Sequence, residues 1–199
     1  MAALLWRPSP QRVYVVGLGG GRIPAVLGHH FPDARIDCTE VDPEVIAVAA
    51  RFFGVVAGEQ LRILLQDGRE FLERREAAGP YDVIVVDAFT GRGSGVARLA
   101  TLEFFAACRR QLAPGGVLVL SVLPGDPWGD RKLAAVGASF LRAFAYEEDG
   151  ARVAFGYDGE AIGRDELIRR ARRLQRDCRF AFSLSSVARR LWPLAAGIR

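Results

Sequence analysis

The stretch Val-Tyr-Val-Val-Gly-Leu-Gly-Gly-Gly, residues 13–21, decides the fold of this 199-residue chain. Its first four residues are a short β-rich run that stops at glycine, which is typical of a buried strand. A helix is expected next, from about Arg22 to His30. Glycines in such a turn let the backbone approach a ligand closely, and the following helix offers free N–H groups to an anion. The stretch therefore predicts a strand–turn–helix unit with a ligand at the turn.

Strands and helices keep alternating along the next hundred residues. Asp42 and Pro43 are typical of a helix cap and a first helical turn. Such alternation predicts an α/β fold with a doubly wound, mostly parallel sheet and right-handed crossovers. Strands are expected at 34–40, 61–65, 81–86 and 117–122, and helices from 42, at 68–76 and at 101–111.

The last third of the chain follows a different pattern. We expect a helix at 133–144, an antiparallel hairpin formed by 143–146 and 152–157, a basic amphipathic helix at 164–176 and a short helix at 183–191. The hairpin brings the predicted sheet to seven strands. No internal repeat or linker interrupts the sequence, so we expect one domain over 1–199, with a 12-residue lead, no separate N-terminal β domain and a basic helical end at 164–199.

The composition excludes several classes of protein. No apolar run reaches the roughly 18–20 residues that cross a bilayer, and no signal-peptide pattern begins the chain. Three widely spaced cysteines, Cys38, Cys108 and Cys178, form neither a disulfide framework nor a zinc spacing, so we expect buried thiols, no metal and a cytoplasmic protein. The net charge is +4, and its arginine excess lies in 151–199. We interpret that end as a solvated helix face; we do not expect nucleic acid as a partner, because aromatic residues for base stacking are scarce there.

Four features fall at the predicted carboxyl ends of successive strands, where open α/β sheets bind their ligands. The glycine turn follows the first strand, Glu40 ends the second, Asp67 follows the third and Asp87 follows the fourth. Judged singly, Glu40 is equally a surface carboxylate, Asp67 a helix cap and Asp87 a loop aspartate. Together they fit an adenosyl cofactor, with Glu40 on the ribose hydroxyls, Asp67 on the adenine amino group and Asp87 facing the reacting group. A nicotinamide enzyme would more often have Gly-x-Gly-x-x-Gly and would not need Asp67.

Over residues 13–122 the sequence resembles the spermidine synthase family, the aminopropyltransferases, and its methyltransferase-fold relatives. Four segments carry the resemblance: 13–21, Cys-Thr-Glu-Val-Asp-Pro-Glu-Val-Ile at 38–46, Gln-Asp-Gly-Arg-Glu-Phe-Leu at 66–72 and Tyr-Asp-Val-Ile-Val-Val-Asp-Ala-Phe at 81–89. The resemblance implies the Rossmann-like class I methyltransferase fold and a homodimer. It also implies a cofactor site made of Gly17, Gly19, Gly20, Gly21, Glu40, Val41 on the adenine ring, Asp67, Gly68 and Asp87.

The sequence departs from the family in the part that handles the polyamine. Gly20 stands where the family carries an aspartate that holds the amine of decarboxylated S-adenosylmethionine. The catalytic loop of the family reads Asp-Ser-(Ser or Thr)-Asp, whereas here Asp87-Ala88-Phe89-Thr90 ends in Thr90. The N-terminal β domain of the family has no counterpart in the 12 residues before the first strand.

Three hypotheses follow. The first is a methyltransferase that uses intact S-adenosylmethionine on a small-molecule acceptor, with Asp87 orienting the acceptor or the methionine amine and Thr90 as a second catalytic candidate. The second is an aminopropyltransferase of polyamine synthesis that uses decarboxylated S-adenosylmethionine. The third is a non-catalytic binding or assembly protein whose basic C-terminal helix meets a partner.

Overall fold

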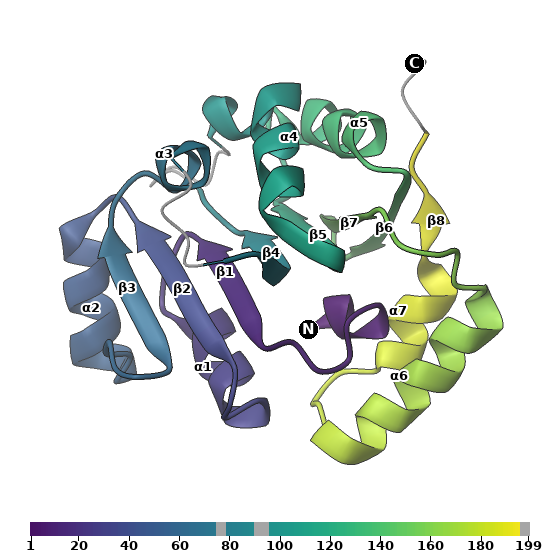
Figure 1. Cartoon of the computed structure of the whole chain (residues 1–199), viewed down its shortest axis with the longest axis horizontal. Helices are drawn as coiled ribbons and strands as arrows, with labels where there is room; N and C mark the ends of the chain where they lie inside the picture. Colours follow the sequence, from purple (N-terminus) through teal and green to yellow (C-terminus); the bar gives the residue numbers. More distant parts are fainter. Residues whose placement is uncertain (75–78, 90–95, 196–199) are drawn as a thin grey trace.

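The computed structural model describes residues 1–74, 79–89 and 96–195, and its centre is a single sheet (Figure 1). The strands lie in the order β3-β2-β1-β4-β5-β7-β6-β8, with β1 to β5 parallel and the last three antiparallel. This is the α/β fold of class I methyltransferases that the sequence predicts. The strands are β1 Arg12–Val16, β2 Arg35–Glu40, β3 Leu61–Leu65, β4 Tyr81–Val86, β5 Leu112–Val122, β6 Arg142–Glu148, β7 Ala151–Tyr157 and β8 Trp192–Pro193.

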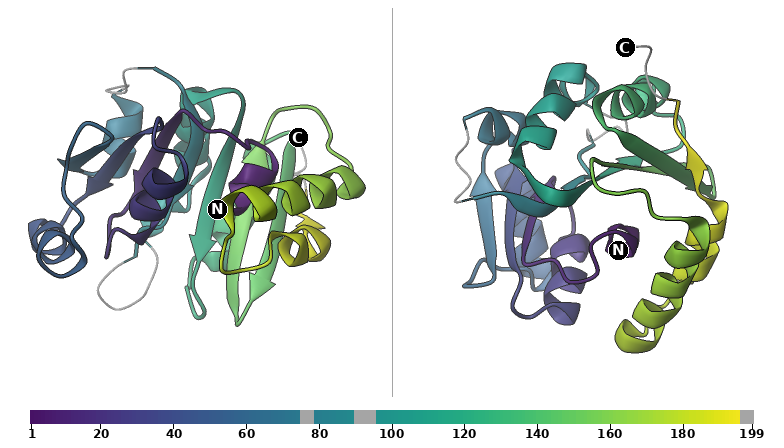
Figure 2. Two further views of the ribbon diagram at one scale, coloured as in Figure 1. Left: turned by 90° about the horizontal axis from the view of Figure 1, so that it is seen from below. Right: turned by 45° about the vertical axis from the view of Figure 1, so that its right-hand side comes forward.

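Two layers of helices cover the sheet (Figures 1 and 2). α3, α4 and α5 lie along one face, and α1, α2, η1, α6 and α7 lie on the other. Alternate strand residues face opposite layers, as the two-residue period of a strand requires: Val83 and Val85 join the core under α1, while Ile84 and Val86 join the core under α4. The helices are η1 Ala2–Leu5, α1 Arg22–His30, α2 Pro43–Phe53, α3 Gly68–Glu73, η2 Ala97–Leu99, α4 Leu102–Gln111, α5 Gly129–Ser139, α6 Arg164–Cys178 and α7 Leu184–Arg190.

Local signals fix where α2 and α4 begin. Asp42 caps α2 by accepting a hydrogen bond from the Glu44 amide at 2.8 Å, and Pro43 occupies the first turn. Thr101 caps α4 in the same way through the Phe104 amide, at 3.3 Å. These caps satisfy amide groups that a helix start leaves without partners. The starts of the helices around the site are therefore set by neighbouring residues.

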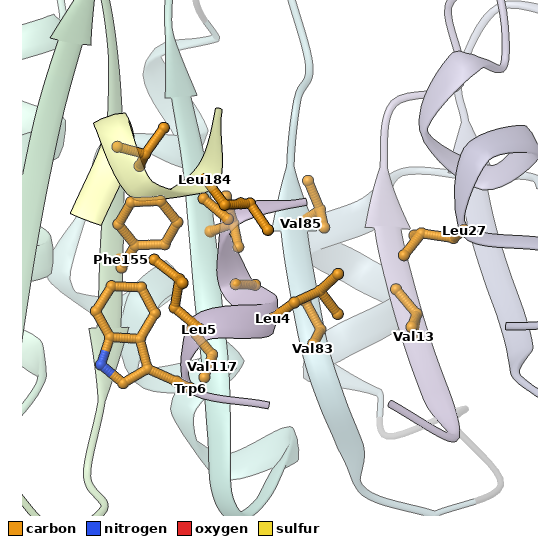
Figure 3. Packing of buried hydrophobic residues seen from close by; sticks show 14 of the residues in the cluster. Leu4, Leu5, Trp6, Val13, Leu27, Val83, Val85, Val117, Phe155 and Leu184 are labelled. Atoms are coloured by element: carbon orange, nitrogen blue, oxygen red, sulfur yellow. The ribbon is translucent and has the colours of Figure 1, made fainter. Parts of the chain in front are cut away.

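The N-terminal lead is part of the core. Residues 2–6 are all buried, and η1 lies between α1 and α7 on the face of β4 and β5 (Figure 2). Figure 3 shows Leu4 and Leu5 directed at the valines of β4 and β5, beside Trp6. The Trp6 ring packs on Phe155, with centroids 4.9 Å apart. The segment thus closes the sheet face that α1 leaves open.

Several predicted boundaries differ from the structure, most clearly those of α5 and β5. The helix expected at 133–144 is α5, which begins four residues earlier and ends at Ser139; Phe140 is buried in extended backbone, and β6 begins at Arg142. β5 begins at Leu112, which pairs with Tyr81 before a register shift. β8 pairs with β6 and adds an eighth strand to the seven that the sequence predicts.

Among the described residues, no helix is both long and apolar enough to cross a membrane.

Candidate functional site

Backbone hydrogen bonds bring the ends of β1, β2 and β4 together. The Gly17 amide donates to the Thr39 carbonyl at 2.9 Å, and the Asp87 amide donates to the Val16 carbonyl at 2.9 Å. A β-carbon built on Gly17 would lie 2.6 Å from the Asp87 carbonyl oxygen, and the φ of Gly17 is +94°. Glycine is therefore required at 17 both by the left-handed conformation and by the close approach of the β4 end.

The Glu40 carboxylate joins the glycine turn to the start of α2. Its Oε2 accepts from the Leu18 amide at 3.0 Å, and its Oε1 accepts from the amides of Val41 at 2.8 Å and Asp42 at 3.1 Å. An ionised carboxylate has about four acceptor positions, so about one remains, on Oε2. Val41 beside it is 65% exposed, which leaves its side chain open to a ligand. Glu40 is thus part of the scaffold and retains capacity for one further donor.

The exposed part of the glycine turn is Gly19 and Gly20. Gly21 is buried at φ +69°, and a β-carbon there would lie 2.6 Å from Val55. Gly20, in contrast, does not adopt a left-handed φ, and a β-carbon there would meet only the Phe53 ring, at 3.7 Å. Position 20 therefore has room for a side chain, although the sequence places none there.

Asp67 caps α3 and pairs with an arginine that sequence reasoning missed. Its Oδ1 accepts from the amides of Arg69 at 2.8 Å and Glu70 at 3.1 Å, and its Oδ2 accepts from Arg98 Nη1 at 3.1 Å. Arg98 lies in η2, and its side chain is 58% exposed. No motif marks Arg98, because it lies 31 positions from Asp67 in the sequence. The cap accounts for Oδ1 only, and Oδ2, which accepts from Arg98, retains capacity for a further donor.

Gly68 is buried beneath the site rather than exposed in it. A β-carbon there would lie 2.6 Å from Val16 Cγ1 and 2.8 Å from Thr39 Oγ1. The Tyr14 hydroxyl donates to the Gly68 carbonyl at 3.0 Å and contacts Thr39 Oγ1 at 2.8 Å. Burial raises the pKa of Tyr14, so the hydroxyl stays protonated. This buried contact fixes the start of α3 against β1 and β2, and therefore fixes the place of Asp67.

Asp87 lies at the end of β4, half-buried, with Ala88 and Phe89 after it. Gly17, Glu40, Asp67 and Asp87 are thus brought to one edge of the sheet, as the sequence predicts. Thr90, the second catalytic candidate, lies outside the described residues, so the structure places the first half of that loop only.

The loop after β5 carries a buried ion pair that the sequence gives no hint of. Lys132 Nζ lies 2.9 Å from Asp126 Oδ2, and both side chains are almost fully buried. Asp126 Oδ1 accepts from the Trp128 amide at 2.9 Å. The pair fixes the loop 123–128 at the carboxyl end of β5. Its groups therefore position that loop.

Comparisons with known proteins identify a family and several related transferases. The model of the spermine/spermidine synthase domain matches residues 2–142. A polyamine aminopropyltransferase of Vibrio vulnificus is 32% identical over 157 residues, covering 77% of this chain and 52% of that protein. The bovine eEF1A lysine and N-terminal methyltransferase is 30% identical over 151 residues, covering 71% of this chain and 22% of that protein.

Among solved structures, human methyltransferase-like protein 13 in complex with SAH is similar with a TM-score of 0.77 and 27% identity. The match covers 92% of this chain and 88% of that one. The chain spans about half the length, or less, of the curated relatives compared above. Relatives of both transferase types therefore share its fold.

Proposed function

The chain belongs to the spermine/spermidine synthase domain family, and from that premise we propose that it is an S-adenosylmethionine-dependent methyltransferase acting on a small-molecule acceptor. The observation that carries the proposal is Gly20, an exposed position with room for a side chain but no acid. An aspartate there would repel the methionine carboxylate of the intact cofactor. Its absence favours the intact cofactor over the decarboxylated one.

The adenosyl half of the site is made of carboxylates held by backbone amides. We assign the free position on Glu40 Oε2 to a ribose hydroxyl, Asp67 Oδ2 to the adenine amino group and the exposed Val41 side chain to the ring. The exposed amides of Gly19 and Gly20 are placed for the methionine end. These groups fit the cofactor, and they need no rearrangement of the buried scaffold beneath them.

When bound, S-adenosylmethionine supplies an electrophilic methyl group to a nucleophile in line with its C–S bond. Much of the catalysis in such a transfer is positioning. Asp87 at the end of β4 is our candidate for orienting the acceptor or the methionine amine, with Thr90 as the second candidate. A protein base is needed only where the acceptor must lose a proton, which depends on the pKa of the acceptor.

Calorimetry on the full chain tests the choice of cofactor. We expect S-adenosylmethionine and S-adenosylhomocysteine to bind more tightly than decarboxylated S-adenosylmethionine. Tighter binding of the decarboxylated form, together with release of methylthioadenosine in the presence of putrescine, would establish the aminopropyltransferase instead. Failure of every adenosyl ligand would leave the non-catalytic hypothesis, and sedimentation of the same sample reports on the expected homodimer.

An Asp67→Asn variant tests the adenine contact apart from the helix cap. Asparagine caps helices as well as aspartate does, so α3 should persist. Its amide would lose the charge-assisted hydrogen bond, worth about 1.5–3 kcal/mol, or roughly 10- to 100-fold in the Kd of S-adenosylhomocysteine. Asp42→Asn at the cap of α2 is the matched control and should leave the affinity unchanged. If the two variants change the Kd of S-adenosylhomocysteine equally, Asp67 does not contact the adenine.

A further inference from the structure

A cavity lies directly beneath the proposed transfer site. Its volume is about 140 Å³, and it lies between η1, α1 and one face of the strands β4, β5, β6 and β7. The part of the cavity nearest the carboxyl ends of the strands is lined by Val85, two residues before Asp87, and by Ser121, the next-to-last residue of β5. Ile23, two residues after Gly21, lines it from α1. The cavity therefore adjoins both the glycine turn and the end of β4, where an acceptor must lie.

The side chains that line the cavity are apolar apart from two hydroxyls, and the buried amino group of Met1 belongs to the lining as well. Val83, Val85, Val119, Val153 and Phe155 supply much of its surface, and Figure 3 shows some of these side chains between the strands and η1. An engineered apolar cavity of about 150 Å³ binds benzene. The cavity thus has the size of one six-membered ring.

The two hydroxyls, Ser121 Oγ and the Tyr146 phenol, give the cavity a polar corner. Neither has a hydrogen-bond partner within the part of the chain that the structure describes. Tyr146 is stacked on Phe155, with centroids 6.0 Å apart and planes 12° from parallel, so its ring is fixed. Arg190 lies over the outer side of that ring and Glu148 lies nearby, yet burial is the largest effect and raises the pKa of Tyr146. The phenol therefore remains a hydrogen-bond donor at neutral pH.

A polyamine does not fit this cavity. None of the described residues that line it is a carboxylate. An ammonium group moved there from water would lose its hydration with no carboxylate in the lining to pair with, which is strongly unfavourable. Burial likewise lowers the pKa of the Met1 amino group, which belongs to the same lining, to about 6, against a smaller opposing effect of Asp87. A neutral ring with one oxygen or nitrogen would bury its carbon atoms against the valines and reach the two hydroxyls with its polar atom.

We propose that this cavity is the acceptor subsite and that it takes a neutral, ring-sized group bearing one hydrogen-bonding atom, as in a phenol. The proposal names the substrate class of the proposed function and rests on it. Ser121 and Tyr146 bind the polar atom, and the valines of β4 and β5 bind the ring.

Titration of the full chain with phenol, benzene and putrescine, followed by ligand-detected NMR, tests the proposal. We expect saturable binding of phenol, weaker binding of benzene and none of putrescine at this site. Tyr146→Phe keeps the stacked ring and removes one hydrogen bond. It should therefore weaken phenol binding by about 2- to 10-fold and leave benzene binding unchanged. Ser121→Ala should likewise weaken phenol binding and leave benzene binding unchanged.

A pair of valine variants on one strand shows where the ring binds. Val119 lines the cavity, whereas Val117, two residues earlier on the same face, is fully buried and does not. Val119→Ile should raise the melting temperature by filling space and should weaken phenol binding. Val117→Ile should lower the melting temperature, because it overpacks a filled site, and should leave phenol binding unchanged.

Three outcomes overturn the proposal. The first is no saturable phenol binding by a sample that binds S-adenosylhomocysteine. The second is phenol binding that Val119→Ile and Tyr146→Phe both leave unchanged, and the third is phenol binding that does not respond to the two valine variants as described, which places the ring elsewhere. A sample that binds phenol as expected but no adenosyl ligand would retain the ring site and refute the proposed methyltransferase. The two failures are therefore distinguishable.

Discussion

Replacing Gly20 by aspartate should change which cofactor the chain prefers. The substitution fits, because Gly20 has no left-handed φ and its β-carbon would meet only the Phe53 ring at the ordinary distance of 3.7 Å. The new carboxylate would face the methionine carboxylate of the intact cofactor. Decarboxylated S-adenosylmethionine lacks that group and offers an amine instead.

Coulomb's law sets the size of the effect. Two like charges about 4 Å apart repel by about 1 kcal/mol in water and about 4 kcal/mol at the effective dielectric of a protein surface. We therefore expect Gly20→Asp to weaken the binding of S-adenosylmethionine by roughly 5- to 1,000-fold, since each 1.4 kcal/mol is tenfold in Kd. Because Gly20 is exposed, the loss should lie toward the lower end and shrink as salt is added.

Calorimetric titration of both cofactors into wild type, Gly20→Asp and Gly20→Asn is the assay. Asparagine has nearly the same shape without the charge, so it separates repulsion from crowding. The reasoning is refuted if the aspartate variant melts as wild type does and still binds the intact cofactor unchanged. It is also refuted if the asparagine variant loses as much affinity as the aspartate variant.

Three further predictions concern stability. Lys132→Met removes the buried ion pair between Lys132 and Asp126 and should cost about 3–5 kcal/mol in the free energy of unfolding in urea, most of which Asp126→Asn in the same chain should restore. Gly68→Ala adds a methyl 2.6 Å from a neighbouring side chain and should cost about 1–3 kcal/mol, whereas Gly58→Ala, which meets nothing within 4 Å, should be close to neutral. Burial, and to a lesser extent a nearby acid, raises the pKa of Cys38 from 9.0 to about 12, so above pH 9 the unfolded chain loses a proton that the native chain keeps. The free energy of unfolding should then fall by up to about 1.4 kcal/mol per pH unit from pH 9 to 12, and Cys38→Ala should reduce that slope in urea titrations at pH 8 and 10.

The parts of the fold predicted correctly are those encoded by neighbouring residues. The strands at 61–65 and 81–86 and the helix at 22–30 agree with the structure residue for residue, because glycines, caps and apolar runs mark their ends. The helix predicted to end near 144 has no such stop signal. It ends at Ser139 because Phe140 is buried in extended backbone and Asp158 accepts from the Leu141 amide, at 2.8 Å. That contact joins residues far apart in the sequence, so local patterning could not reveal it.

The candidate site also has a part that neighbouring residues encode and a part that depends on contacts between distant segments. Its carboxylates end successive strands, so their order along the chain already places them at one edge of the sheet. Arg98 pairs with Asp67 across 31 positions, and the cavity combines η1 with four strands from both halves of the chain. Contacts of that range depend on how the helices pack, which no local pattern records.

The two halves of the site also differ in how freely they can change. Glu40 and Gly68 cannot be replaced without loss of backbone contacts that fix the turn between β1, β2 and α3, so the adenosyl half is tied to the fold itself. Gly20 faces solvent, and Val119 changes only the volume of a cavity, so both can vary while the scaffold persists. Cofactor preference and acceptor binding should therefore be separable by single substitutions. Gly20→Asp should change which form of the cofactor binds without changing phenol binding. Val119→Ile should weaken phenol binding without changing the cofactor preference.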